Sequence, residues 1–254
     1  MFTLGIDLST DPKKTGVRVI EWTEAGPRLR DVSGPWSDTA LLDLIEQADV
    51  VGIDVPLGWS EAFVAAVSGW NRGRTWPGPY GPTTRAALCY RATDRWLQRE
   101  HGAQPLSVAT DRLGAKAMRA AGLLAALDER RVAVDRTGLK GRAVEVYPAA
   151  ALAKWGLRFK GYKGTKEAPR AARESLVDHV ARALALSLDG PQRQLLIDVV
   201  HEFDTLVSAL VARASRLPGG TLAPDSEYRD SAACEGWIHV PLLGLGELML
   251  GRRD

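Results

Sequence analysis

One four-residue pattern occurs twice in this chain and constrains its fold most. Gly5-Ile6-Asp7-Leu8 and Gly52-Ile53-Asp54-Val55 each place an acid within an apolar run that is typical of a strand. Burying a carboxylate on a central strand is costly unless it is paired or binds a cation. If the two strands are adjacent, Asp7 and Asp54 lie side by side and repel, unless Mg²⁺ or Mn²⁺ sits between them. The alternative interpretation is that each aspartate only caps a turn at a strand end.

The first 56 residues predict a three-stranded meander, a helix and a central strand. Residues 2–8 and 16–22 alternate between apolar and polar side chains, and residues 28–34 form a weaker third strand. Residues 37–48 carry an apolar helical stripe with a capping residue at the start. Residues 49–56 are almost continuously apolar, as in a strand covered on both faces.

The rest of the chain alternates loops and helices with one further clear strand. The Gly- and Pro-rich residues 59–82 predict a loop, and 83–131 have a helical pattern. Residues 142–147 predict the fifth strand, and 160–166 a basic loop; helices are expected at 149–155, 168–188 and 191–216, and 235–241 could add a short strand. This order favours an α/β fold, with a mixed five-stranded sheet flanked by helices. We expect one domain over 1–254, with a helical and loop insertion at about 59–140.

Composition excludes several classes of protein. A net charge of +2 excludes a histone-like polycation, and no apolar run is long enough for a membrane helix. The chain has two cysteines, Cys89 and Cys234, and four histidines that are not spaced as metal ligands. This composition argues against a zinc site. With no secretory signal at the N-terminus, the simplest expectation is a cytoplasmic protein without membrane contact.

Two further acids are candidates for chemistry. Asp204 has small neighbours on a predicted helix and no Lys or Arg three or four positions away, although a surface aspartate is the competing interpretation. Glu145 lies inside a predicted strand and could be a ligand, a base or an outward-facing residue. Acids from separate elements, without His or Cys, suit hard cations. Two such ions would activate a water and stabilise the leaving oxygen in phosphodiester hydrolysis.

Basic and aromatic side chains predict contact with nucleic acid. Residues 69–99 contain six arginines and a single acid, with Trp70, Trp76, Tyr80 and Trp96 interleaved. Arginine binds phosphate and aromatic rings stack on bases, so this composition suits single strands or distorted duplexes. The candidate substrate-binding residues are Arg72, Arg74, Arg85, Arg91, Trp76, Lys160 and Lys163. An Arg-rich composition and Trp-rich loops that merely cover a core edge are the competing explanation.

A family resemblance covers residues 4 to 241. Its segments are Gly5-Ile6-Asp7, residues 52–58, 91–94 and 145–148, residues 203–210, and Glu235-Gly236-Trp237-Ile238. Together they resemble the uncharacterised family numbered 429 among domains of unknown function, described as predicted nucleases with a ribonuclease H-like fold. The resemblance implies metal-binding acids at Asp7, Asp54 and Asp204, and Glu145 follows the Glu-Val-Tyr-Pro signature of the family. The first predicted helix offers only Asp43 and Glu46, which lie on a polar face. The arrangement of the acids is therefore nearer to that of the Holliday-junction resolvase branch.

The sequence therefore favours a nuclease that depends on Mg²⁺ or Mn²⁺, and two alternatives stay open. One is a phosphotransferase or nucleotide hydrolase of the actin and sugar-kinase type, because residues 5–10 resemble a first phosphate loop. Those proteins need two copies of the meander, and the chain has one. The other is a protein that binds nucleic acid without catalysis. The partner would be DNA or RNA, and cleavage of branched DNA would favour a homodimer.

Overall fold

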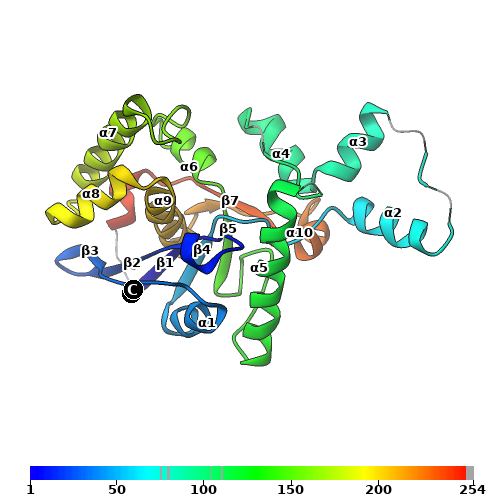
Figure 1. The fold of residues 1–254 in the computed structure, drawn as a ribbon, viewed down its shortest axis with the longest axis horizontal. Helices are drawn as coiled ribbons and strands as arrows, with labels where there is room; N and C mark the ends of the chain where they lie inside the picture. Colours follow the sequence, from blue (N-terminus) through cyan, green and yellow to red (C-terminus); the bar gives the residue numbers. More distant parts are fainter. Residues whose placement is uncertain (75, 79–80, 104, 110, 250–254) are drawn as a thin grey trace.

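A mixed seven-stranded sheet forms the centre of the protein (Figure 1). The computed structural model describes residues 1–74, 76–78, 81–103, 105–109 and 111–249, so Tyr80 lies outside the described residues. The strand order is β3-β2-β1-β4-β5-β7-β6; β1 pairs in parallel with β4, β4 with β5 and β5 with β7, and the remaining pairs are antiparallel. The strands are β1 Phe2–Asp7, β2 Gly16–Thr23, β3 Gly26–Arg30, β4 Val50–Ile53, β5 Ala143–Val146, β6 Thr221–Leu222 and β7 Ile238–Pro241.

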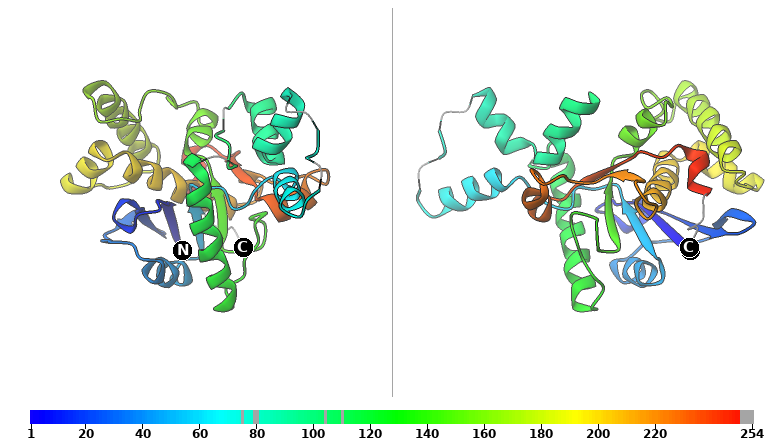
Figure 2. Two further views of the ribbon diagram at one scale, coloured as in Figure 1. Left: turned by 45° about the vertical axis from the view of Figure 1, so that its right-hand side comes forward. Right: turned by 180° about the vertical axis from the view of Figure 1, so that it is seen from behind.

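Helices cover both faces of the sheet (Figure 2). One apolar cluster joins β2, β4 and β5 to α6, α7, α8 and α9, and a second joins β1 and β4 to α1 and α5. The helices are α1 Asp38–Gln47, α2 Glu61–Asn71, α3 Pro82–Cys89, α4 Ala92–His101, α5 Asp111–Glu129, α6 Pro148–Lys154, α7 Glu167–Ala183, α8 Gly190–Asp198, α9 Val200–Ser215 and α10 Arg229–Glu235; two short 3₁₀ turns are Pro12–Lys14 and Leu245–Met249. Within the described residues, no helix is long and apolar enough to cross a membrane.

The sheet is larger than the five strands expected from sequence. Ile238 pairs with Glu145, so β7 continues the parallel part of the sheet beyond β5. The two-residue strand β6 then pairs with β7. Strands this short carry too little periodicity to be recognised from their residues alone. The α/β class and the mixed sheet are confirmed, and the five expected strands are β1 to β5.

Element boundaries differ from the expectations in several places, and three of them have a clear local cause. Residues 61–71 form α2 rather than loop, because the glycine and proline residues concentrate after residue 72 and leave an Ala-rich run before it. The third strand is Gly26–Arg30 rather than 28–34. The helix expected at 191–216 is two helices, α8 and α9, because Val199 adopts an extended backbone between them.

The insertion between β4 and β5 consists of α2 to α5. Helix α5 packs against α1, and α4 packs through Leu97 on Ala150 and Ile238. Helices α2 and α3 project away from the sheet (Figures 1 and 2). The insertion therefore has one part fixed to the core and one part that extends from it.

Candidate metal centre

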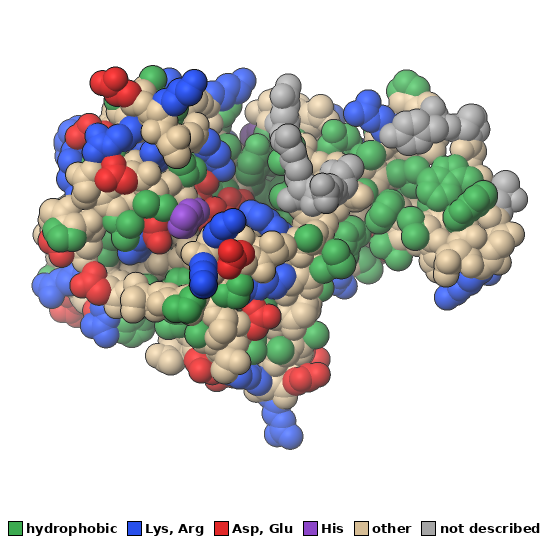
Figure 3. Space-filling view, viewed as in Figure 1, with side chains coloured by type: hydrophobic (Ala, Val, Ile, Leu, Met, Phe, Trp, Pro, Cys, Tyr) green, Lys and Arg blue, Asp and Glu red, His purple; other side chains and the backbone are tan. Residues whose placement is uncertain are grey.

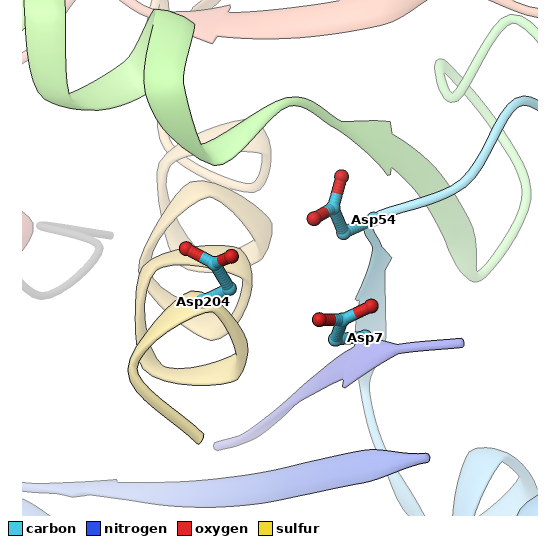
Figure 4. Close-up of side chains that lie close together, drawn as sticks. All are labelled: Asp7, Asp54 and Asp204. Atoms are coloured by element: carbon cyan, nitrogen blue, oxygen red, sulfur yellow. The ribbon is translucent and has the colours of Figure 1, made fainter. Parts of the chain in front are cut away.

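Asp7 and Asp54 lie side by side at the carboxyl ends of two adjacent parallel strands. Ile6 pairs with Ile53, so the two aspartates occupy the next position of the register. Leu4, Ile6 and Ile53 belong to the cluster under α1 and α5. Since side chains alternate across a strand, Asp7 and Asp54 point to the opposite face, where α9 lies (Figure 4). The adjacency expected from the repeated pattern is confirmed.

Helix α9 approaches the sheet closely because two glycines lie beneath it. Gly5 and Gly52 are paired across β1 and β4. A Cβ atom at Gly5 would lie 1.9 Å from the carbonyl oxygen of Thr205, and one at Gly52 would lie 2.2 Å from that of Ser208. No side chain fits at either position, so the backbone of α9 rests directly on the sheet. This close approach brings Asp204 to the strand ends.

Asp7, Asp54 and Asp204 form one carboxylate cluster, here called the aspartate triad. One carboxylate oxygen from each residue lies within 4.8 Å of the others. Burial raises the pKa of Asp54 well above its ordinary value, and the charge of Asp7 raises it further. Burial likewise raises the pKa of Asp204. Three carboxylates crowded in a partly desolvated place are unfavourable without a cation.

Two lysines approach the aspartate triad from different segments. Lys163 Nζ lies 2.8 Å from Asp204 Oδ2, and Lys116 Nζ lies 3.6 Å from Asp7 Oδ1. Burial alone would lower the pKa of Lys163, but the charges of Asp204 and Asp54 outweigh it and raise that pKa. Two ammonium groups offset only part of the charge of three carboxylates. The chemistry of the donors, all carboxylate oxygens, suits a hard divalent cation such as Mg²⁺ or Mn²⁺.

The loop that carries Lys163 is anchored by buried polar contacts. The Tyr162 hydroxyl donates a 2.8 Å hydrogen bond to Asp204 Oδ1, and Tyr162 is fully buried. Arg173 of α7 donates to the carbonyl oxygens of Tyr162 and Gly164. Gly164 has φ of +126°, a conformation that favours glycine. Lys163 itself stays about half exposed, with a side-chain accessibility of 52%.

Glu145 belongs to a separate buried network, which corrects its expected catalytic role. Val144 and Val146 face α9, so Glu145 points to the opposite face of the sheet, away from the aspartate triad. Its Oε1 accepts a 2.6 Å bond from Arg91, and its Oε2 accepts one of 2.9 Å from the Leu57 amide. These contacts make Glu145 a structural link between β5 and the insertion.

Arg91 is also corrected, because its side chain is only 2% exposed. Its guanidinium donates to Glu145, to Asp94 and to the carbonyl oxygen of Glu235. Those carboxylates outweigh burial and raise the pKa of Arg91 further. A substrate cannot reach this group without unfolding the network. The expectation that Arg91 binds substrate is therefore wrong.

The other expected substrate-binding residues fall into two places. Lys160 and Lys163 share the loop beside the aspartate triad. Arg72, Arg74 and Trp76 lie just after α2, and Arg85 lies on α3, on the projecting part of the insertion (Figure 1). Hydrophobic side chains gather on that projection (Figure 3), and Trp70 is 63% exposed. The structure does not bring the two places together.

Sequence reasoning missed Lys116 and Tyr162 as neighbours of the aspartate triad. Lys116 lies on α5, far from Asp7 in sequence, and its only local signal is a single lysine among alanines. Tyr162 adjoins Lys163 between two glycines, in a loop that was noted for its charge alone. Contacts of this kind depend on how α5 and the loop fold back over the sheet.

Fold and site together define an α/β protein with an aspartate triad at the carboxyl ends of β1 and β4. Residues 5–229 match the family described as "Protein of unknown function (DUF429)", so the chain belongs to that family. No curated protein and no solved structure matches the chain significantly.

Proposed function

We propose that the protein is a nuclease that hydrolyses phosphodiester bonds with Mg²⁺ or Mn²⁺. The aspartate triad carries this proposal, because three carboxylate oxygens from three elements lie within 4.8 Å of one another. Asp7, Asp54 and Asp204 would hold the metal. A bound divalent cation supplies an activated water and stabilises charge on the leaving oxygen. Burial and the charge of Asp7 raise the pKa values of Asp54 and Asp204, and a bound cation would favour the charged carboxylates.

The topology supports the ribonuclease H-like part of the proposal. The meander β1 to β3 is followed by α1 and then by β4 and β5, which run parallel to β1, and these five strands lie in the order β3-β2-β1-β4-β5. The acids lie on the first strand, directly after the fourth and on a late helix. We propose that these five strands are the ribonuclease H-like core, and that β7 and β6 extend its edge.

The lysines beside the aspartate triad suit an anionic substrate. Lys163 contacts Asp204 and is still half exposed, so its ammonium group can also meet a phosphate at the triad. Lys160 is exposed on the same loop. Arg72, Arg74 and Arg85 on the projecting helices offer a second contact with the same nucleic acid, farther from the bond that is cut.

Cleavage of a labelled substrate panel tests the proposal. The panel contains single-stranded and duplex DNA and RNA, a hybrid and a four-way junction, each with Mg²⁺, Mn²⁺ or EDTA. Wild type is compared with Asp54→Asn and with Asp43→Asn, a matched change on α1 where the carboxylate is 57% exposed. We expect metal-dependent cleavage that Asp54→Asn reduces more than about a hundredfold, since even outer-shell partners of a metal contribute up to that factor. Asp43→Asn should cleave normally.

Absence of cleavage from every substrate, by folded protein that binds metal, would overturn the nuclease proposal. Thermal stabilisation by nucleotides in the same preparation would then favour the phosphotransferase alternative. Tight nucleic-acid binding that Asp7→Asn leaves unchanged would favour a binding protein without catalysis.

A further inference from the structure

A pocket of about 330 Å³ opens between α4 and α6. The carboxyl end of α4 contributes His101, α6 contributes Ala150 and Lys154, and the chain after α6 contributes Phe159 and Lys160. Tyr147, the residue directly after β5, completes the wall nearest the sheet. In the space-filling view the surface is hollowed between the α6–α7 side and the α4–α5 side (Figure 3).

Two segments that line this pocket also lie near the aspartate triad: Tyr147, directly after β5, and the loop that carries Lys160 and Lys163. Ile53 pairs with Glu145, so Asp54 and Tyr147 both lie just beyond the paired ends of neighbouring strands. Burial raises the pKa of the Tyr147 hydroxyl, and the charges of Lys163, Asp54 and Asp204 also act on it. Lys160 lines the pocket, and Lys163, three residues later, contacts Asp204. A molecule in the pocket would therefore lie beside Tyr147 and the loop of residues 160–163, the two segments that connect the pocket to the triad.

The lining combines planar rings, an apolar wall and positive charge. Phe159 is 39% exposed, and the Lys160 ammonium lies 5.3 Å from the centre of its ring. Lys154 adds a second positive charge, and the pocket has no carboxylate among its described lining residues. His101 can exchange hydrogen bonds through its imidazole, and burial lowers its pKa, which favours the neutral ring. The matching ligand has a flat, largely apolar ring with polar edges and an adjoining negative charge.

We propose that this pocket receives one unpaired nucleobase of the substrate, with the adjoining phosphates on Lys154 and Lys160. The proposal rests on the proposed nuclease function and names its substrate class: nucleic acid that is single-stranded beside the bond to be cut. A base inside a duplex is stacked and paired, so it reaches such a pocket only after it unpairs and unstacks. Stacking on an aromatic ring tolerates every base, so the pocket selects strandedness rather than sequence.

Binding measured without cleavage tests the pocket. The full-length Asp54→Asn protein in EDTA is titrated into fluorescein-labelled single-stranded DNA, single-stranded RNA and a blunt duplex, with fluorescence anisotropy as the readout. We expect the single strands to bind at least about tenfold more tightly than the duplex, and Phe159→Ala to weaken their binding by about tenfold. Lys154→Ala should weaken it too. Lys140→Ala is the matched control, because Lys140 is exposed and lies before the amino end of β5, whereas the pocket lies beyond the carboxyl end of that strand.

A strand with one 2-aminopurine adds a direct readout of stacking. When the 2-aminopurine is placed at successive positions of the strand, we expect one position at which protein binding quenches its fluorescence. The Phe159→Ala variant should restore the fluorescence at that position. The DNA and RNA arms identify which sugar the pocket accepts.

The outcomes separate the two proposals. Equal binding of duplex and single strand, or single-strand binding unchanged by both Phe159→Ala and Lys154→Ala, would overturn the pocket. Rapid cleavage of blunt duplex by wild type with Mg²⁺ would also overturn the pocket and leave the nuclease proposal intact. Conversely, single-strand binding that depends on Phe159, without cleavage by wild type, would support the pocket and contradict the nuclease proposal.

Discussion

Gly5 and Gly52 face each other across β1 and β4, and both lie directly beneath the backbone of α9. Each glycine is two residues before an aspartate of the triad. The same strands thus provide an opening for the helix and the carboxylates that meet it. In the repeated Gly-Ile-Asp pattern, the glycine allows α9 to pack on the sheet and the aspartate supplies a carboxylate to the triad.

Filling the opening under α9 should destabilise the fold. Gly52→Ala places a methyl group 2.2 Å from the Ser208 carbonyl oxygen, which forces the helix away from the sheet. We expect a loss of several kcal/mol of unfolding free energy, measured by urea denaturation. Gly122→Ala on α5 meets nothing within 4 Å and should stabilise by about 0.5–1 kcal/mol. Equal effects of the two changes would contradict this account of the glycines.

Removing one carboxylate from the triad should stabilise the protein when no metal is present. Asp7 repels Asp54, and Asp7→Asn removes that repulsion and lowers the pKa of Asp54. We expect a gain of about 1 kcal/mol, which raises the Tm in EDTA by roughly 2–4 °C for a protein of this size. The increase of Tm caused by Mg²⁺ in wild type should disappear. A Tm in EDTA below that of wild type would disprove repulsion within the triad.

Lys163 and a divalent cation should compete for Asp204. Lys163→Met removes the ammonium group 2.8 Å from Asp204 Oδ2 and leaves the triad with less positive charge. We expect a lower Tm in EDTA and a severalfold tighter apparent affinity for Mg²⁺, measured by following Tm during a Mg²⁺ titration. Lys166→Met, at an exposed position three residues later, is the control and should behave as wild type. Unchanged or weaker Mg²⁺ affinity in Lys163→Met would exclude competition.

The Arg91 network should be essential for stability rather than for chemistry. Arg91→Ala leaves Glu145 and Asp94 buried without a counterion, and breaking a buried pair from one side costs about 3–5 kcal/mol. Urea denaturation of this variant should show that loss. Arg99→Ala on α4, the helix that Arg91 directly precedes, removes an exposed side chain and should leave the denaturation midpoint unchanged. A fully stable Arg91→Ala protein with impaired substrate binding would restore the original expectation for this residue.

Acid should destabilise the protein in part through His239. Burial lowers the pKa of His239 from 6.5 to about 4, and its ring is held between Thr221 and the Thr137 carbonyl oxygen. Between these pH values the unfolded chain binds a proton that the folded protein does not. The stabilisation is therefore complete above about pH 6.5 and is lost as pH falls toward 4, on the order of 3 kcal/mol in total.

The control for this pH dependence is His239→Gln. The variant has no titrating ring, so its unfolding free energy should fall less on acidification than that of wild type over the same interval. If the two proteins lose stability in parallel, His239 does not cause the effect.

The sequence predicted those parts of the fold and site that local patterns encode. Alternation identified β1 and β2, a continuous apolar run identified β4, and the matched acids predicted that Asp7 and Asp54 are neighbours. The small residues noted around Asp204 lie on the face of α9 that packs closely on Gly5 and Gly52. These signals are local because each depends on the period of a single strand or helix.

Long-range contacts could not be predicted in the same way. Arg91 was interpreted by its charge, but its burial depends on where β5 and α10 lie. Glu145 resembles Asp7 and Asp54 in its local context, an acid between aliphatic residues at a strand, but it points to the other face of the sheet. Lys116 reaches Asp7 from the insertion, and no residue pattern specifies the path of the insertion over the sheet.

The position of α9 late in the chain has a consequence for protein synthesis. Asp7 and Asp54 leave the ribosome early, whereas Asp204 follows Asp54 by 150 residues (204 − 54). Until α9 emerges, the glycine-lined face of β1 and β4 lacks the helix that covers it in the folded protein. An unfinished chain also holds two of the three carboxylates. Translation that stops before α9 therefore yields a product without the complete cluster, and only the finished protein can assemble it.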